Sequence, residues 1–103
     1  NYTNAIIDNT RAIELNDYIP EPYYNRCLVY FIVSNYNDAL SDINHYIDIQ
    51  GVEDKVWKAN AHKLRGDIYI KLNQQKLAIL DYQKSRDLGN EEAKQALRAL
   101  DAS

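Results

Sequence analysis

The chain has 103 residues, of which 46% are hydrophobic and 26% are charged, a composition typical of one soluble globular domain. Twelve Lys and Arg residues against fifteen Asp and Glu residues give a net charge of −3. The chain therefore lacks the general basic field that attracts a phosphate backbone, and no nucleic-acid partner is expected. The single cysteine, Cys27, excludes an internal disulfide and a multi-thiolate metal site.

The apolar runs of the sequence are short, and none approaches the ~20 residues that a membrane-spanning helix needs. No membrane segment and no membrane partner are expected, and these features together predict a cytoplasmic protein. The chain begins with Asn1 and contains no methionine. We therefore expect an upstream part, with any targeting information, to be missing.

The sequence repeats itself at two related intervals. Sliding the sequence along itself until Asn1 falls on Asn35 brings further similar residues together: Tyr2, Ala5, Ile6 and Ile13 fall on Tyr36, Ala39, Leu40 and Ile47. A slightly longer shift, which places Arg26 on Arg65, does the same further along: Tyr30, Ala39 and Leu40 fall on Tyr69, Ala78 and Ile79. Five extra residues lie between Ile49 and Ala59. One unit is therefore present twice in full and once as its second half.

The first predicted element is a helix over residues 2–16, the second helix of the incomplete unit. Because its first partner helix is missing, Ala5, Ile6 and Ile13 are expected to keep apolar surface exposed. Either more repeats precede this segment in a longer protein, which we favour, or another copy of the chain supplies the covering helix.

A complete unit is predicted over residues 20–50. Pro22 suits the first turn of its first helix, and the turn Ser34–Asn35 separates that helix from a second one that Gly51 ends as a left-handed cap. The apolar face of the first helix repeats at helical spacing: Tyr23, Cys27, Tyr30 and Val33. The second helix does likewise: Ala39, Leu40, Ile43, Tyr46 and Ile47.

A second complete unit is predicted over residues 54–88, after the five-residue insertion. Its first helix is expected to begin near Asp54 and to be longer than its counterpart. Trp57 in this helix either packs against the end of the preceding helix, the favoured interpretation, or overhangs a binding groove as an anchor. A turn at Asn73–Gln74 leads to a helix with apolar residues at helical spacing: Leu77, Ala78, Ile79, Tyr82 and Leu88.

The last predicted element is a capping helix over residues 90–101. Gly89 ends the preceding helix, Asn90 is a good N-cap, and one face is apolar: Ala93, Ala96, Leu97 and Leu100. A terminal helix with a polar outer face closes the open end of a helical repeat stack.

This repeat resembles the tetratricopeptide repeat, whose motif is W-x2-L-G-x2-Y followed by A-x3-F. Matching residues occur in both complete units: Tyr23, Cys27, Tyr30, Ala39 and Ile43, then Gly66, Tyr69, Ala78 and Tyr82. His62 replaces the first aromatic residue, and Arg26 and Arg65 take the Leu position. The resemblance covers nearly the whole chain and implies a single all-α domain over 1–103, a right-handed α-solenoid of antiparallel helix pairs with about two and a half units and the capping helix.

The resemblance also implies a function, because tetratricopeptide repeats bind a peptide or helix of a partner protein in a concave groove. The family's groove positions fall here on ten residues: Tyr24, Asn25, Leu28, Phe31, Ile32, Asn60, Lys63, Leu64, Asp67 and Ile70. Asn25 matches the Asn with which one group of these domains holds a C-terminal carboxylate, but Asn60 and Leu64 stand where that clamp has Lys and Arg. A partner with apolar anchors is therefore expected, unless neighbouring hairpins bury Leu28 and Phe31.

The sequence offers little for catalysis, and no enzyme activity and no cofactor are expected. Cys27 is interpreted as a small buried hydrophobe, and His62 as a half-buried core residue. Asp42, His45 and Asp48 share a helical stripe that a divalent metal could use, but a solvated outer face is the favoured interpretation, so no metal site is predicted. The expected role is a protein-binding scaffold or adaptor.

The alternative role is self-assembly into homo-oligomers through the exposed N-terminal edge. The charge is uneven along the chain: residues 1–50 hold two basic and seven acidic side chains, and residues 51–103 hold ten basic and eight acidic ones. This difference in charge between the two halves could steer a partner or align copies of the chain head to tail.

Overall fold

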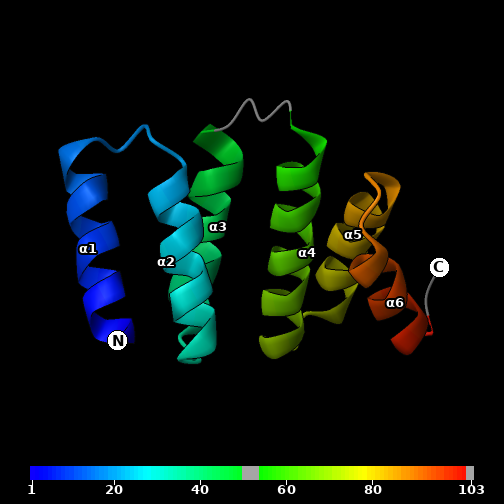
Figure 1. The fold of residues 1–103 in the computed structure, drawn as a ribbon. Helices are drawn as coiled ribbons and strands as arrows, with labels where there is room; N and C mark the ends of the chain where they lie inside the picture. Colours follow the sequence, from blue (N-terminus) through cyan, green and yellow to red (C-terminus); the bar gives the residue numbers. More distant parts are fainter. Residues whose placement is uncertain (50–53, 102–103) are drawn as a thin grey trace. The chain divides into compact units, whose positions relative to one another are not determined.

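The computed structural model describes residues 1–49 and 54–101, and these contain six α-helices. The helices are α1 (Tyr2–Leu15), α2 (Glu21–Ile32), α3 (Tyr36–Ile49), α4 (Lys55–Lys71), α5 (Gln75–Asp87) and α6 (Glu91–Ala99). They pack sequentially in pairs (Figure 1), so the all-α class predicted from the repeat is confirmed.

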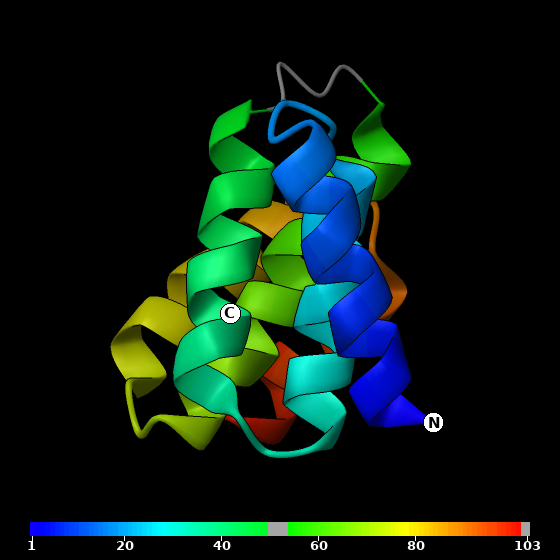
Figure 2. The same ribbon diagram turned by 90° about the vertical axis from the view of Figure 1, so that its left-hand side faces the viewer.

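The chain forms two compact units, Asn1–Gly51 and Val52–Ser103, called unit 1 and unit 2 below. In unit 1, α2 packs against both α1 and α3, and Figure 2 views this unit from the side of α1. In unit 2, α5 packs against both α4 and α6. Each unit is thus a helical hairpin, α2–α3 or α4–α5, with one further helix beside it.

Three of the helices have a short polar residue as their N-cap. The side-chain oxygens of Asn1, Asp54 and Asn90 accept hydrogen bonds from backbone N–H groups in the first turns of α1, α4 and α6, which satisfies donors that the helix itself leaves unpaired. As the insertion predicts, α4 starts after Asp54 and is longer than α2, with 17 residues against 12.

The two hairpin turns have the same construction. Ser34 and Asn73, which the longer sequence shift superimposes, both adopt left-handed backbone with φ of 66° and 60°. The next residue in each turn donates a 2.8 Å backbone hydrogen bond to the carbonyl of Tyr30 or Tyr69. These bonds close the helix ends and confirm both predicted turns.

Helix α5 also ends at a residue with positive φ, since Gly89 has φ +102°. The N–H groups of Gly89 and Asn90 donate to the carbonyls of Arg86 and Ser85 at 2.8 and 3.1 Å, a Schellman arrangement. The left-handed cap predicted at Gly51 lies outside the described residues.

Small residues in α2 and α4 let the partner helix of each hairpin approach closely. Cys27 is fully buried near Ile43 in unit 1. At the equivalent place in unit 2, a Cβ on Gly66 would lie 2.6 Å from a ring carbon of Tyr82. A smaller residue on the first helix is thus matched by a larger one on the second, as close packing requires.

Other apolar side chains that the repeat pattern placed on packing faces remain exposed. Val33, the C-cap residue that follows α2, is 44% exposed, and Leu77 in the first turn of α5 is 43% exposed. Helix α1 contains no buried residue. Its predicted edge residues Ala5, Ile6 and Ile13 are half-buried, and its largest apolar exposure is at Leu15, with 82%.

Candidate peptide-binding faces

The predicted groove residues of unit 1 lie on α2, and three of them form an exposed ridge. Asn25 is exposed, Leu28 is 38% exposed and Ile32 is 55% exposed. Their spacing of three and four residues places them on one side of the helix. This set, Asn25, Leu28 and Ile32, is called the α2 ridge below.

The other two predicted groove residues of α2 are half-buried and pack inside unit 1. The Tyr24 ring lies against Tyr46 with centroids 5.0 Å apart, and the Phe31 ring meets the Tyr36 ring edge-on at 5.6 Å. Burial raises the pKa of Tyr24. Phe31 is thus partly covered by Tyr36 of its own hairpin, and Leu28 is exposed, so neither is fully buried as the alternative with neighbouring hairpins expects.

The predicted groove residues of unit 2 lie on α4 and are less accessible. Leu64 is only 7% exposed, so the structure places it in the core rather than on a binding surface. Ile70 is half-buried against the cluster of α5 and α6 residues. Asn60 accepts a 3.2 Å hydrogen bond from the side-chain amide of Asn90.

Lys63 and Asp67, the charged members of the predicted set, form a salt bridge with each other. The Lys63 ammonium lies 2.8 Å from Asp67 and 3.5 Å from Glu92 of α6. Burial would lower the pKa of Lys63, but these two carboxylates outweigh it and raise the pKa. Asp67 also accepts a 2.6 Å hydrogen bond from the Tyr82 hydroxyl. Lys63 is therefore already neutralised within unit 2 and is a weaker cation for an acidic ligand than the sequence suggests.

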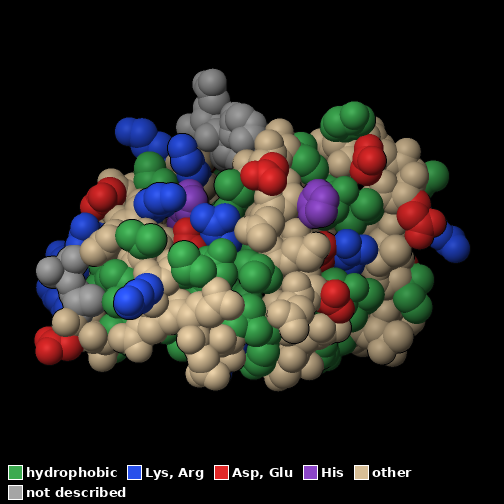
Figure 3. Space-filling model, turned by 180° about the vertical axis from the view of Figure 1, so that it is seen from behind, with side chains coloured by type: hydrophobic (Ala, Val, Ile, Leu, Met, Phe, Trp, Pro, Cys, Tyr) green, Lys and Arg blue, Asp and Glu red, His purple; other side chains and the backbone are tan. Residues whose placement is uncertain are grey.

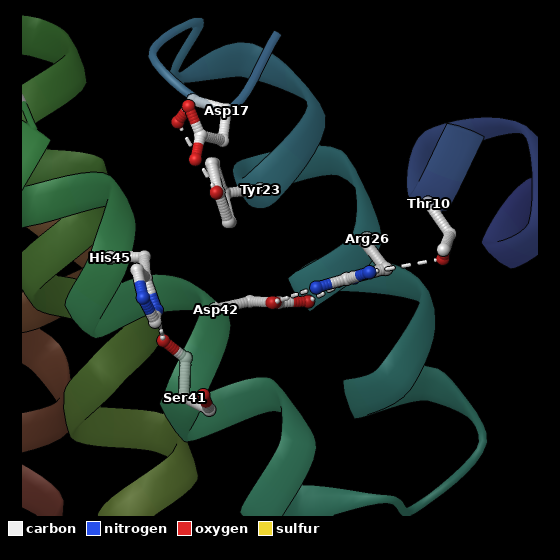
Figure 4. Close-up of polar contacts among 7 residues, drawn as sticks. All are labelled: Thr10, Asp17, Tyr23, Arg26, Ser41, Asp42 and His45. Atoms are coloured by element: carbon white, nitrogen blue, oxygen red, sulfur yellow. Dashed lines mark hydrogen bonds and ion pairs between the residues drawn. The ribbon is translucent and has the colours of Figure 1, made fainter. Parts of the chain in front are cut away.

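Sequence reasoning missed a charged pair that recurs inside both hairpins. Arg26 donates to both carboxylate oxygens of Asp42 at 2.8 and 2.6 Å and also to the Thr10 hydroxyl at 3.0 Å, as Figure 4 shows. Asp42 is 2% exposed. The prediction that Asp42 lies on a solvated face is wrong, because its carboxylate points inward to meet the guanidinium.

Unit 2 contains the same pair at the equivalent positions, with a histidine added. Arg65 donates to both oxygens of Asp81 at 2.8 and 2.9 Å, and His62 Nδ1 lies 3.0 Å from Asp81. Burial would raise the pKa of Asp81, but the hydrogen bonds from His62 and Arg65 lower it below its usual range. An ionised carboxylate only accepts hydrogen bonds, so His62 carries its proton on Nδ1. The shift that carries Arg26 onto Arg65 also carries Asp42 onto Asp81, and this signal could have revealed the pairs.

His45, a sequence candidate for metal binding, contacts two residues of unit 1. His45 stacks on Tyr23 with ring centroids 5.3 Å apart and donates to the Ser41 carbonyl (Figure 4). Within residues 1–49 and 54–101, no group of three or more His, Cys, Asp and Glu side chains is placed to hold a metal ion. In the same residues, no helix is both long enough and apolar enough to cross a membrane.

Cys27 is expected to be unreactive in the folded protein. Burial raises the pKa of its thiol to about 12, so the nucleophilic thiolate is scarce at neutral pH. Native protein should react with a thiol-specific chromogenic disulfide only at the rate of transient opening, and denatured protein should react within minutes. Rapid stoichiometric labelling of the native chain at pH 7 would contradict this burial.

Comparisons with known proteins agree with the geometry. No protein-family model matches the chain, and no curated protein matches it. Among solved structures, the first TPR of Spaghetti (RPAP3), bound to the HSP90 peptide SRMEEVD, has 26% sequence identity and a TM-score of 0.84, and the match covers 97% of this chain and 77% of that one.

A second match is the N-terminal domain of stress-induced protein-1 (STI-1) from C. elegans, with 22% identity and a TM-score of 0.80. It covers 92% of this chain and 77% of that one. Together with the motif residues and the paired helices, these matches show that the chain has the fold of a tetratricopeptide repeat domain.

Proposed function

We propose that this chain is a protein-binding adaptor that holds a partner peptide or helix through apolar anchors on the α2 ridge. The observation that carries the proposal is the exposure of Leu28 and Ile32 beside the polar Asn25. An apolar strip with one amide handle is typical of a helix that contacts a partner segment. The fold is one that binds peptides in the RPAP3 structure and is typically non-catalytic.

The charge pattern favours a partner other than an acidic C-terminal tail. In the family, the clamp for a terminal carboxylate needs cations where this chain has Asn60 and Leu64. Leu64 is buried, and the nearby Lys63 is held by Asp67 and Glu92. A carboxylate ligand would have to compete with both acidic side chains for this ammonium. A partner with bulky apolar residues meets no such competition on α2.

Substitutions on the α2 ridge are expected to weaken partner binding at least tenfold. Asn25→Ala with Ile32→Ser removes the amide and the most exposed anchor, and tenfold corresponds to about 1.4 kcal/mol. Val56→Ser is the matched control, because Val56 is 66% exposed but lies at the start of α4. Partners captured from a cell extract by the native chain would be identified and then titrated against each variant by fluorescence anisotropy.

The peptide SRMEEVD serves as the second probe in the same titration. Without the cationic clamp, the chain should bind it at least tenfold more weakly than a captured apolar partner. Equal affinity for both probes, or unchanged binding by the ridge variant, would reject the proposal. Helix content measured by circular dichroism should be the same for all variants, because exposed substitutions usually change stability by about 0.5 kcal/mol or less.

Self-assembly remains the alternative function, and the exposure of α1 favours it. Helix α1 has no buried residue, and Tyr2, Ile7 and Leu15 are each more than half exposed. A chain that pairs through this helix would show a mass that rises with concentration in sedimentation equilibrium. A constant mass of one chain up to high concentration would exclude this function.

A further inference from the structure

Helix α5 carries an exposed strip of apolar and basic side chains that neither hairpin packing nor the α2 ridge uses. Leu77 and Leu80 are 43% and 54% exposed, and Lys76 and Lys84 are also exposed. Spacings of three, four and seven residues place these side chains on one side of the helix. Figure 3 views the side on which α5 lies, and blue and green side chains adjoin each other on its left. The four residues are called the α5 strip.

The repeat itself does not require these leucines. The shift that carries Arg26 onto Arg65 also carries four residues of α3 onto the strip: Asn37, Asp38, Ser41 and His45 fall on Lys76, Leu77, Leu80 and Lys84. All four α3 residues are polar and exposed. The same hairpin therefore forms in unit 1 with a fully polar strip, so the apolar strip of α5 has no counterpart in the packing of the repeat.

An open hollow lies beside one end of the strip. It is lined by residues 73–77, which include Lys76 and Leu77, and has a volume of about 440 Å³. It is mostly open to solvent, so a side chain of another molecule can reach Leu77 from this end of the strip. Leu77 thus offers a partner an accessible apolar contact at this end of the strip.

The exposed charge of the strip is positive. Lys76 and Lys84 form no ion pair with any residue in the described part of the chain. The acidic residue nearest to them in sequence on α5, Asp81, is buried against Arg65 and His62. Asp87, at the end of α5, pairs with Arg86. A complementary surface is therefore acidic at its ends and apolar between them.

We propose that the α5 strip is a second docking surface, on which a partner protein lays an acidic amphipathic helix. Lys76 and Lys84 are separated by roughly 12 Å along the helix axis. Two carboxylates about two turns apart on the partner meet these ammonium groups, and the apolar residues between them cover Leu77 and Leu80. Exposed ion pairs contribute little affinity, so the leucines supply the attraction and the lysines fix the charge and direction of the partner.

A synthetic helical peptide tests this surface. The probe has two glutamates two turns apart with leucines between them on the same face, and a charge-reversed copy has lysines in place of the glutamates. Both are labelled and titrated by fluorescence anisotropy with the whole chain. The chain should bind the acidic peptide at least tenfold more tightly than the charge-reversed one.

Two variants locate the binding on α5. Leu77→Asp with Leu80→Ser copies the residues that α3 has at these positions, so the variant should fold, and it should bind the acidic peptide at least tenfold more weakly. Lys76→Glu with Lys84→Glu should reverse the preference between the two peptides. The exposed Lys94→Glu on α6 is the control and should leave that preference unchanged.

Two further measurements test whether another surface or another kind of partner accounts for the binding. The α2 ridge variant should bind the acidic peptide as the native chain does, which separates this surface from the proposed function. Loss of binding in that variant, equal affinity for both peptides, or binding unaffected by Leu77→Asp with Leu80→Ser would overturn the proposal. Vesicles of phosphatidylcholine with phosphatidylserine form the last arm. Strip-dependent binding to these vesicles without peptide binding would assign the α5 strip to a membrane surface instead.

Discussion

Asp81→Ala is expected to destabilise the chain by about 3 kcal/mol, because it removes a buried carboxylate that accepts hydrogen bonds from two side chains of α4. Asp81 is 3% exposed and accepts hydrogen bonds from Arg65 and His62. Removing one partner of a buried ion pair costs roughly 3–5 kcal/mol. The Arg65 side chain is 18% exposed, and its partial return to water places the expected loss near the lower end of that range. Urea unfolding followed by circular dichroism measures it.

Asp42→Ala in unit 1 is the matched comparison and should cost less. Tyr23 rather than a histidine occupies the position that corresponds to His62, so the loss of Asp42 deprives one side chain fewer of its carboxylate partner. Asp87→Ala, an exposed carboxylate of α5, controls for the loss of one negative charge and should change stability by about 0.5 kcal/mol or less.

Replacing both members of the pair should recover part of the loss. Arg65→Leu together with Asp81→Ala restores the leucine that the family motif has at this position and removes the guanidinium whose carboxylate partner is lost. The double variant should therefore be more stable than Asp81→Ala alone. If Asp81→Ala unfolds at the same urea concentration as Asp87→Ala, the pair contributes nothing and the assignment is wrong.

Acid should unfold the native chain partly through this carboxylate. The pKa of Asp81 is lowered in the folded state, so its stabilising effect is present above the unfolded-state value of about 3.9 and is lost as the pH falls through the lower folded-state pKa. Asp81→Ala lacks this group, and its stability should fall less steeply than that of the native chain below about pH 4. If the stabilities of the two proteins fall equally steeply below about pH 4, this role of Asp81 is contradicted.

The helical hairpins could be predicted because their signals are local. Turn residues, N-caps and apolar residues three or four apart specify the helices, and the repeated residues give their pairing. The longer shift also superimposes the two turns, at Ser34 and Asn73. The same shift carries Asp42 onto Asp81 as well as Arg26 onto Arg65. The pairs were nevertheless missed, because an arginine at a leucine position resembles a tolerated exception when its acidic partner lies on another helix.

The candidate site was less predictable, because the repeat register specifies positions and not exposure. Asn25, Leu28 and Ile32 lie on an open side of α2, whereas Leu64 occupies the position that corresponds to Asn25 and is buried. The neutralisation of Lys63 depends on Glu92 in α6, a contact between residues far apart in the sequence. Contacts of this kind depend on how three helices pack together, and no short sequence pattern contains that information.

Gly66→Ala is expected to destabilise the chain by about 2 kcal/mol, although alanine favours a helix over glycine by about 1 kcal/mol. The added Cβ would lie 2.6 and 2.8 Å from two ring carbons of Tyr82. The ring has little room to move, since Tyr82 is 3% exposed and its hydroxyl donates a 2.6 Å hydrogen bond to Asp67. Thermal unfolding should show a melting temperature lower by several degrees for a chain of this size.

Unit 1 supplies the compensating pair for this experiment. Cys27 and Ile43 occupy the positions that correspond to Gly66 and Tyr82, and both are fully buried. Gly66→Cys should destabilise the chain at least as much as Gly66→Ala, because it adds a sulfur atom to the same crowded site. Tyr82→Ile should also destabilise it, since it opens a cavity and leaves Asp67 without the tyrosine hydroxyl.

The double variant Gly66→Cys with Tyr82→Ile should be more stable than the sum of its single effects predicts, by about 1 kcal/mol or more, because the small residue and the ring compete for one volume. Purely additive losses would mean that Tyr82 can move aside without cost. In that case the close approach of α4 and α5 does not depend on glycine at position 66. A favourable coupling would instead mean that the fold limits the combined volume of the two contacting side chains. Either helix can then supply the larger residue of the pair.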